Sequence, residues 1–377
     1  MDANFQYSDQ FGPFKTIHLY EPSVDLKAVL VIDNIALGPS IGGIRMAPDV
    51  TTEECLRLAR AMTFKNAAAG LPHGGGKAVI CADPKMNRQD KEILVRAFAQ
   101  GLRNEEGYIF APDMGMDEEC MAWIRDEVGR AVGLPKELGG IPLDELGATG
   151  WGLAQAVEIV SQECGFKVRG SRFVVQGFGA VGQHVSRFLV EQGALLVGVS
   201  DSRGAIVNEG GVDVAKLMAC KAEGKPVTEY RDAVQIPSDD LVEVDCDIWI
   251  PAARPDVIHK DNVHRMNTKI VVQGANIPCT QAAEMYLHQH GVLCIPDFIA
   301  NAGGVICAAM EYHGSTQAAA FEAIEHKVRD NTLLVLKRMS EQAMLPREAA
   351  VDLAKERLTK TMASRRYSLF STAPHFL

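Results

Sequence analysis

Apolar residues in the first third of the chain fall alternately into short continuous runs and helical repeats. The continuous runs predict strands at residues 28–32, 77–81 and 108–111. Apolar residues spaced three and four apart predict helices at residues 51–70, 88–101 and 117–132. Thr51 or Thr52 would cap the first helix, which has acidic residues in its first turn, and residues 38–48 are expected to form a loop.

The same alternation resumes after residues 133–150, which are rich in Gly and Pro and indicate a connection between domains. Strands are expected at residues 171–176, 194–201, 246–250 and 269–273, and residues 315–377 have a mainly helical pattern. Alternation of strand and helix is typical of α/β domains. We therefore expect two α/β domains with a cleft: a substrate domain at 1–137 and a Rossmann-type domain at 138–344. The C-terminal helix, at about 345–377, should pack back on the first domain.

Composition narrows the class of protein. The 377 residues are 47% hydrophobic and carry a net charge of −10 with acids and bases mixed, which argues against binding of nucleic acid. The nine cysteines include no C-x-x-C pair, so we expect reduced thiols in a cytoplasmic protein and no metal site. The polar, acidic first ten residues do not resemble a signal peptide, and no apolar run is long enough to span a membrane.

A glycine motif in the second half predicts a dinucleotide site. It lies between a predicted strand and a predicted helix, and the next strand ends in Asp201. Such glycines permit a tight turn, close approach of a pyrophosphate and close packing of helix on strand. An acid at Asp201 would bind the ribose hydroxyls and favour NAD over NADP, although Arg203 could offset this; a structural turn is the alternative. The motif residues are Gly177, Phe178, Gly179, Ala180, Val181 and Gly182.

Two lysines lie in otherwise apolar or glycine-rich surroundings. Lys65 is on the first predicted helix, where its neighbours three, four and seven positions away include Leu58, Met62 and Ala68. We therefore expect Lys65 to point into a core, where its ammonium needs an anion, either from the protein or from a ligand. A structural ion pair or a lysine that extends to solvent is the alternative.

Lys77 follows Gly74–Gly76 and begins a predicted strand. The string is not a phosphate-binding P-loop, because Leu71 replaces its first glycine and Ala78 replaces its Ser or Thr. The glycines would instead let backbone and substrate approach each other closely. Asp113, between Pro112 and two methionines, is either an acid–base group or a turn residue.

Seven segments resemble the glutamate/leucine/phenylalanine/valine dehydrogenase superfamily over nearly the whole chain. In chain order they are GPSIGGIRMAP, AMTFKNAAAGLPHGGGKAVI, APDMG, ATGWGLA, VVQGFGAVGQHV, VVQGAN and PDFIANAGGV. The resemblance implies reversible oxidative deamination of an L-amino acid to a 2-oxo acid and ammonia, with NAD or possibly NADP as cofactor. It also implies a homo-oligomer, which could be a hexamer, octamer or dimer.

The resemblance also implies roles for individual residues. Lys65 would bind the substrate α-carboxylate, Lys77 would be the catalytic lysine of low pKa, and Asp113 would carry protons to and from the amine. Gly42 and Gly43 would shape the backbone beside the substrate. Residues near the cofactor would be Thr149, Ala252, Asn276 and Asn301, in addition to the glycine motif and Asp201.

Four positions bear on the choice of amino acid. Where the glutamate-specific branch has a lysine and a serine for the side-chain carboxylate, this chain has Ile41 and Ala308. Ala111 and Val305 match the remaining walls. All four are aliphatic, as in leucine dehydrogenases, so a leucine, valine or isoleucine substrate is expected, although SDSRGAIVNEGG and GANIPCT are more like glutamate dehydrogenases. Glutamate dehydrogenase is the alternative, and a non-catalytic regulatory subunit is the alternative of another class.

Overall fold

The computed structural model describes residues 5–364, which form two compact units. The first comprises residues 5–142, 305–320 and 351–364, and the second comprises residues 143–304 and 321–350. The boundary at Pro142 lies five residues later than the expected end at 137. Residues 305–320 were expected in the second domain and belong to the first, because Ala308 and Glu311 are buried against first-unit residues. Of the expected C-terminal helix, residues 365–377 lie outside the described residues.

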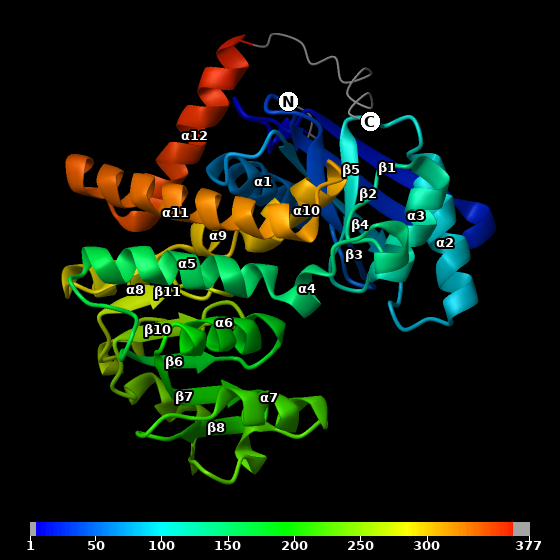
Figure 1. Cartoon of the computed structure of the whole chain (residues 1–377). Helices are drawn as coiled ribbons and strands as arrows, with labels where there is room; N and C mark the ends of the chain where they lie inside the picture. The colour runs from blue at the N-terminus through cyan, green and yellow to red at the C-terminus, as the bar shows by residue number, and fades with distance from the viewer. Residues whose placement is uncertain (1–4, 365–377) are drawn as a thin grey trace. The chain divides into compact units, whose positions relative to one another are not determined.

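A five-stranded sheet with strand order β1-β2-β4-β3-β5 forms the centre of the first unit (Figure 1). β3 is parallel to β4 and β5, and the β1–β2 and β2–β4 pairs are antiparallel. The strands are β1 (Lys15–Glu21), β2 (Leu26–Asn34), β3 (Ser40–Ala47), β4 (Gly74–Cys81) and β5 (Tyr108–Pro112).

Helices pack on both faces of this sheet. The N-cap of α1 (Thr52–Ala68) is Thr51, whose side chain accepts from Glu54 N, as the sequence predicts. α2 (Arg88–Gly101) has the predicted bounds, whereas α3 (Glu118–Val128) ends four residues early because Gly129 adopts a left-handed conformation. α2 and α3 contribute Phe98 and Ile124, among others, to the main core of this unit. α10 (Gly303–Tyr312) and α12 (Pro346–Ser364) provide the later segments of this unit.

The expectation of a loop at residues 38–48 was wrong, because Ser40–Ala47 is the buried strand β3. The glycines of this segment obscured the strand pattern, since glycine is depleted in strands. They serve close packing: a Cβ at Gly42 would lie 1.8 Å from Gly76 O on the neighbouring strand β4. Gly74–Gly76 likewise belong to β4 and do not form a loop before it.

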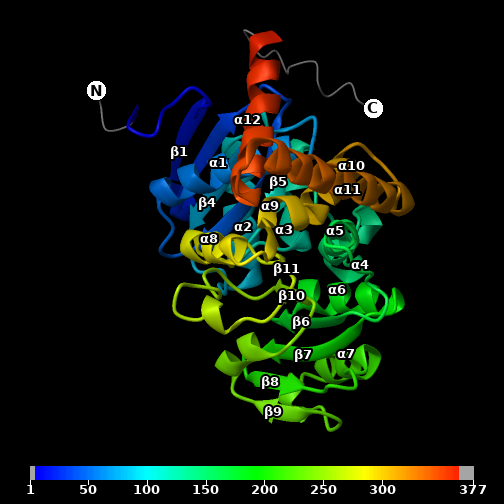
Figure 2. The same cartoon turned by 90° about the vertical axis from the view of Figure 1, so that its left-hand side faces the viewer.

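The second unit has a seven-stranded sheet with strand order β12-β11-β10-β6-β7-β8-β9 (Figure 2). The first five of these strands are parallel, and β8 and β9 add an antiparallel edge that the sequence did not predict. Strand order reverses between β6 and β10, the place where doubly wound sheets bind ligands. The strands are β6 (Arg172–Gln176), β7 (Leu195–Asp201), β8 (Gly204–Val207), β9 (Val234–Ile236), β10 (Ile248–Pro251), β11 (Ile270–Val272) and β12 (Leu293–Ile295).

The helices of the second unit cover this sheet. α5 is apolar around most of its circumference, with eleven buried residues, so it is an interior helix. α11 packs on it through Arg329, which donates to Gln155 and Glu158. The helices are α4 (Leu143–Leu146), α5 (Ala148–Glu163), α6 (Ala180–Glu191), α7 (Val214–Ala222), α8 (Gln281–Gln289), α9 (Asp297–Ala300) and α11 (Gln317–Gln342).

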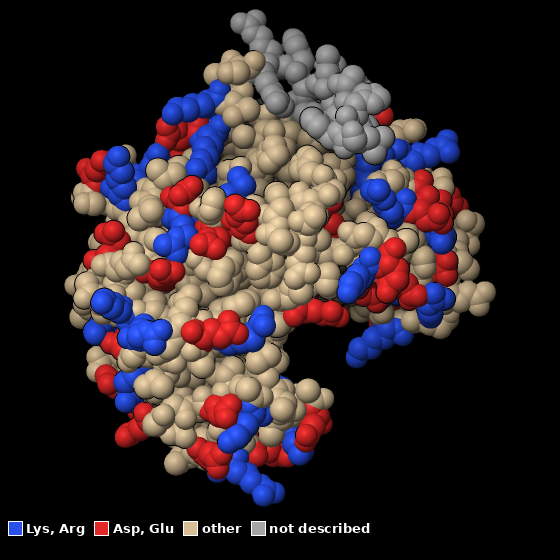
Figure 3. Space-filling view, in the orientation of Figure 1, with Lys and Arg blue, Asp and Glu red and all other residues tan. Residues whose placement is uncertain are grey.

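The surface is mixed in charge. Figure 3 shows Lys and Arg side chains interspersed with Asp and Glu over the face in view. None of the helices in residues 5–364 combines the length and apolar character that crossing a bilayer requires. All nine cysteines are free thiols.

Candidate active site

A buried lysine and an aspartate meet in the first unit. Lys77 lies in β4 with its side chain 7% exposed, and its Nζ donates to Asp113 Oδ2 at 2.5 Å. Asp113 follows β5 directly, and β4 and β5 lie on either side of β3. The sheet therefore brings together two residues that the sequence singled out separately.

Gly43 of β3 lies directly against this pair. A Cβ at Gly43 would be 2.7 Å from Asp113 Cβ, closer than side chains tolerate, and a tight 3.1 Å from Lys77 Nζ. Tyr108 is fully buried, and its hydroxyl donates to Gly42 O at 2.7 Å, which helps to fix the main chain of β3 next to Gly43. Glycine at position 43 is thus required by the space that the pair occupies.

Asp113 also contacts Arg45, a residue that the sequence analysis missed. Arg45 Nε donates to Asp113 Oδ2 at 3.1 Å, and Arg45 Nη1 lies 2.5 Å from Glu54 Oε1. Burial alone raises the pKa of Asp113, but the charges of Lys77 and Arg45 outweigh it and lower that pKa below its ordinary value. Asp113, 27% exposed, is therefore a carboxylate at neutral pH that solvent can still reach.

The structure corrects the expected surroundings of Lys65. Lys65 is half-buried, and of its expected apolar neighbours Ala68 is buried whereas Leu58 and Met62 are half-buried. The buried residues of α1 are Cys55, Ala59, Thr63, Asn66, Ala67 and Ala68. The main chains of α1 and β4 lie in direct contact, since a Cβ at Gly75 would be 2.0 Å from Thr63 N. Only small residues therefore fit where α1 packs on β4.

His73 is buried just before the glycines of β4. Its Nδ1 lies 3.1 Å from Pro39 O, and its Nε2 lies 3.2 Å from Nε2 of His313. Burial, opposed only in part by the contact with Pro39 O, lowers the pKa of His73 to about 4. The ring is thus neutral at physiological pH.

An apolar cluster adjoins this part of β3. Its buried members are Ile41, Ile109, Val132 and Ala308, with Ala111 and Tyr312 packed against them. Val305, half-buried, lies one turn before Ala308 on α10. Three of the four predicted substrate walls thus belong to one aliphatic group, and the fourth lies beside it on the same helix.

In the second unit, the glycine motif has the geometry that a bound dinucleotide requires. Gly177 has a φ of 98°, which favours glycine, and a Cβ at Gly182 would lie 1.9 Å from Gly177 O, so the helix packs directly on the turn. A Cβ at Gly179 would meet nothing within 4 Å, leaving open space before the first amides of α6, at Ala180 and Val181. This arrangement fits a pyrophosphate at the start of a helix.

Asp201 ends β7, as predicted, but both of its oxygens have protein partners. Oδ2 accepts from Lys221 Nζ at 2.7 Å and from Val227 N at 2.9 Å, and Oδ1 accepts from Arg203 N at 2.9 Å. Burial alone raises the pKa of Asp201, but the hydrogen bond from Lys221 and the two amides lower it. Because Lys221 neutralises the carboxylate, Asp201 repels a 2′-phosphate less than an unpaired aspartate would.

The other predicted cofactor residues gather where β10, β11 and α5 meet. Asn301 Nδ2 donates to Asn276 Oδ1 at 3.0 Å, and Asn301 Oδ1 is buried without a hydrogen-bond partner. Thr149 Oγ1 would be 3.1 Å from a Cβ at Gly304, and Ala252 N donates to Gln176 O at 2.7 Å beside the glycine motif. An unsatisfied buried acceptor beside these residues fits a bound group that donates a hydrogen bond.

The predicted residues therefore form two groups, one within each unit. Arg45 and Lys221 complete them and were missed, because each pairs with a carboxylate far away in sequence. The arginine of GGIRMAP was the available signal, since a charged residue within an otherwise apolar segment is rarely left unpaired.

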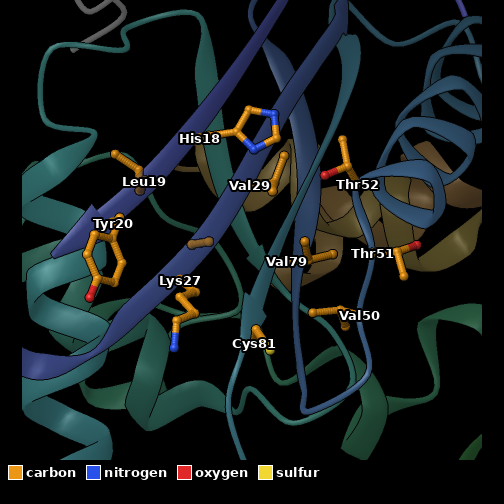
Figure 4. Close-up of a pocket in the computed structure, with 11 residues that line it drawn as sticks. His18, Leu19, Tyr20, Lys27, Val29, Val50, Thr51, Thr52, Val79 and Cys81 are labelled. Atoms are coloured by element: carbon orange, nitrogen blue, oxygen red, sulfur yellow. The ribbon is translucent and has the colours of Figure 1, made fainter. Parts of the chain in front are cut away.

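A separate cavity of about 310 Å³ lies on the first unit's sheet (Figure 4). It is lined by β1, β2, β4 and the start of α1, and by none of the predicted site residues. Within residues 5–364, no group of three or more His, Cys, Asp or Glu side chains is arranged to hold a metal ion.

Comparison with known proteins decides the family. Residues 139–366 match the model described as Glutamate/Leucine/Phenylalanine/Valine dehydrogenase, and residues 5–130 match the Glu/Leu/Phe/Val dehydrogenase dimerisation domain. The chain belongs to this family. It is an NAD(P)-dependent amino-acid dehydrogenase, an oxidoreductase that acts on a CH–NH2 group.

Curated relatives carry the name glutamate dehydrogenase. The protein of that name from Aeropyrum pernix is 36% identical over 355 residues, covering 88% of this chain and 85% of the relative. The NADP-specific glutamate dehydrogenase of Saccharolobus shibatae is 39% identical over 292 residues, covering 74% and 69%. These names do not support the expected likeness to leucine dehydrogenase.

Solved structures share the fold. The hetero-hexameric glutamate dehydrogenase of Thermus thermophilus, in a Leu-bound form, matches with a TM-score of 0.83 at 30% identity and covers 95% of this chain and 91% of that one. The L-tryptophan dehydrogenase of Nostoc punctiforme matches with a TM-score of 0.74 at 25% identity and covers 93% and 97%. The fold with an N-terminal substrate domain and a Rossmann-type domain is confirmed.

Proposed function

We propose that the enzyme reversibly deaminates an L-amino acid with an apolar side chain to its 2-oxo acid and ammonia. The observation that carries the choice of side chain is that Ile41 and Ala308 are buried together with Ile109 and Val132 in one aliphatic cluster. The amino acid, its 2-oxo acid and ammonia are then the small-molecule partners.

Lys77 and Asp113 would carry the proton chemistry. Oxidation of an amine requires its neutral form, so the ammonium of the substrate must first lose a proton, and the Asp113 carboxylate is placed to accept it. Lys77, held 2.5 Å from Asp113, would stabilise negative charge on the oxygen of the attacking water as it adds to the oxidised carbon. Lys65 would bind the substrate α-carboxylate as a counter-ion. Gly42 and Gly43 would let the substrate approach the backbone.

Arg45 would keep Asp113 ionised and oriented. It contacts the same oxygen as Lys77 and is itself anchored by Glu54. Two cations on one carboxylate favour its charged form, which is the form that accepts a proton.

The second unit would hold NAD(P), which supplies the acceptor for the hydride that leaves the substrate. Gly177–Gly182 would bind the pyrophosphate, and Thr149, Ala252, Asn276 and Asn301 would line the cofactor site. Because Lys221 neutralises Asp201, we expect that Asp201 does not by itself exclude NADP.

Glutamate is the second candidate substrate, and the names of the relatives favour it. Its side-chain carboxylate would need a cation, and Arg130, a half-buried arginine near Tyr312, already donates to carbonyls of Tyr108, Val128 and other residues. A carboxylate against the aliphatic cluster would be buried without a partner, which costs several kcal/mol. The residues that would contact the substrate side chain therefore favour an apolar amino acid over glutamate.

A substrate panel tests this choice. We expect the highest kcat/KM with leucine, valine or isoleucine, lower values with phenylalanine and little turnover with glutamate, each assayed with NAD and NADP. Glutamate as the best substrate would overturn the apolar assignment. The double variant Ile41→Lys, Ala308→Ser should raise the ratio of glutamate to leucine activity about a hundredfold, the worth of one charged hydrogen bond. Ile41→Leu is the matched control and should leave that ratio unchanged.

Two further features enter the proposal. A non-catalytic subunit is disfavoured, because Lys65, Lys77 and Asp113 are all present and Lys77 is bonded to Asp113. The dimerisation-domain match and the hetero-hexameric relative support an oligomer, and light scattering of the purified chain would test whether this chain alone forms one.

A further inference from the structure

The segment Gly274–Ile277 follows β11 and has an unusual backbone. Ile277 has a φ of 50°, in the left-handed region that β-branched residues rarely adopt, and its side chain is 58% exposed, so packing does not explain it. The residue before it, Asn276, is one of the proposed cofactor residues. Strained backbone of this kind persists only where the surrounding structure holds it.

Three hydrogen bonds hold the segment in this conformation. Ile277 N donates to Asp297 Oδ2 at 2.9 Å, and Ile277 O accepts from Asp256 N at 3.0 Å. Asn276 Oδ1 accepts from Asn301 Nδ2 at 3.0 Å. Of these, the bond to Asp297 acts directly on the strained residue from a buried side chain, 9% exposed.

Asp297 is in turn held by Arg347. Arg347 Nη1 forms an ion pair with Asp297 Oδ1 at 3.0 Å, and this oxygen accepts no hydrogen bond from the described residues. Arg347 Nη2 lies 2.7 Å from Glu284 Oε1 and donates to Gln273 Oε1 at 2.9 Å. Glu284 is on α8 and Gln273 directly follows β11, and Gln273 Nε2 donates to Glu284 Oε1 at 2.7 Å. Arg347 thus contacts both Gln273, which precedes the 274–277 segment, and Asp297, which accepts a hydrogen bond from Ile277 N.

The position of Arg347 in the first turn of α12 is not stabilised by the helix itself. Arg347 is the second residue of α12, and a cation in the first turn of a helix is opposed by the helix dipole. Two buried carboxylates and a glutamine converge on it instead. These three partners, of which Asp297 also bonds Ile277 N, account for the position of Arg347.

We propose that Arg347 is a positioning residue for cofactor binding, which acts through Asp297 to hold Asn276 and Ile277 in the strained conformation. This rests on the proposed placement of NAD(P) beside Asn276. Without Arg347, Asp297 is free to turn away, Ile277 relaxes to a negative φ, and Asn276 moves with it.

The test measures binding of NADH and NADPH by fluorescence, which needs no turnover. Arg347→Met should raise the dissociation constant about tenfold, equivalent to about 1.4 kcal/mol. Adding Ile277→Gly should restore binding to within about threefold, because glycine adopts a φ of 50° without strain. Rescue of this kind separates positioning from a general loss of stability.

Arg329→Met is the matched control. Arg329 has the same 27% exposure, lies in the same unit and pairs with Glu158 at 2.7 Å, and its partners Gln155 and Glu158 are both on α5. It should lower the Tm comparably and leave the dissociation constant within about twofold. If Arg347→Met does not fold, Arg347→Lys keeps a cation that cannot bridge both carboxylates, and the same weakening and rescue are expected.

The outcomes distinguish this proposal from the proposed function. Unchanged binding in Arg347→Met, or failure of Ile277→Gly to restore it, overturns the role of Arg347. A wild-type enzyme that binds NADH tightly but oxidises no apolar amino acid overturns the proposed substrate and leaves the role of Arg347 standing.

Discussion

The two units each contain a cluster of three buried or half-buried ions, and the clusters have opposite arrangements. In the first, Asp113 is shared by the cations Lys77 and Arg45; in the second, Arg347 is shared by the carboxylates of Glu284 and Asp297. The central ion is 27% exposed in both cases. An aspartate at the centre can gain and lose a proton, whereas an arginine stays charged in proteins. The first cluster is thus suited to chemistry and the second only to holding a shape.

Among substitutions in the first cluster, Lys77→Met should lower turnover the most. Turnover should fall about a thousandfold, within the range that positioned acid–base groups contribute, while NADH binding in the other unit stays unchanged. Steady-state kinetics and fluorescence titration measure the two. Lys269→Met, which removes a lysine paired with Asp247 at 2.7 Å, is the control and should keep full turnover. Turnover within about tenfold of wild type in Lys77→Met would contradict the assigned role.

Gly43→Ala should disturb the same cluster without removing a charge. Its methyl group would displace Asp113 and Lys77, and misplacement of reacting groups by about 1 Å costs about a hundredfold in kcat. At Gly107, the nearest atom to an added Cβ is 3.8 Å away, so Gly107→Ala should be silent. Equal kcat values in the two variants would show that the pair is not confined by Gly43.

His73 of the first unit is a buried titratable group that lies beside a second imidazole, that of His313, and not beside an ion of opposite charge. Its pKa of about 4 lies below the usual 6.5, so the unfolded chain binds more protons between these values, and the resulting stability is complete above pH 6.5 and lost as the pH falls toward 4. Between about pH 7.5 and 5, wild type should lose about 2 kcal/mol more unfolding free energy than His73→Gln. Urea unfolding at a series of pH values measures this, and parallel curves for the two proteins would count against it.

Among these substitutions, Arg45→Met should have the smallest effect. Loss of one of the two cations should raise the pKa of Asp113, so the carboxylate needed for proton acceptance is protonated at a higher pH. We expect kcat/KM to fall about tenfold at neutral pH and further as the pH falls, with the acidic limb of the profile moved upward. An acidic limb at the wild-type position would mean that Arg45 does not act on Asp113.

Local sequence patterns predicted most of the first unit's helices and strands and the residues of the Lys77–Asp113 pair. They failed at β3, because Gly42 and Gly43 weaken its strand pattern while close contact with β4 and Asp113 requires glycine there. Arg45, Lys221 and Arg347 could not be placed from the sequence, since each is defined by carboxylates 9 to 68 residues away in the chain. The strain at Ile277 has no sequence signal, because the residue type does not favour it.

The contact between Gly75 and Thr63 has a consequence for how this enzyme can diverge. The main chains of β4 and α1 touch at these two positions, and each position is followed two residues later by a lysine, Lys77 on the strand and Lys65 on the helix. Backbone packing therefore fixes the main-chain positions of the two lysines relative to each other. If the two lysines have the proposed roles, side chains such as Ile41 and Ala308 could be exchanged for others without moving the main chain that carries Lys65 and Lys77.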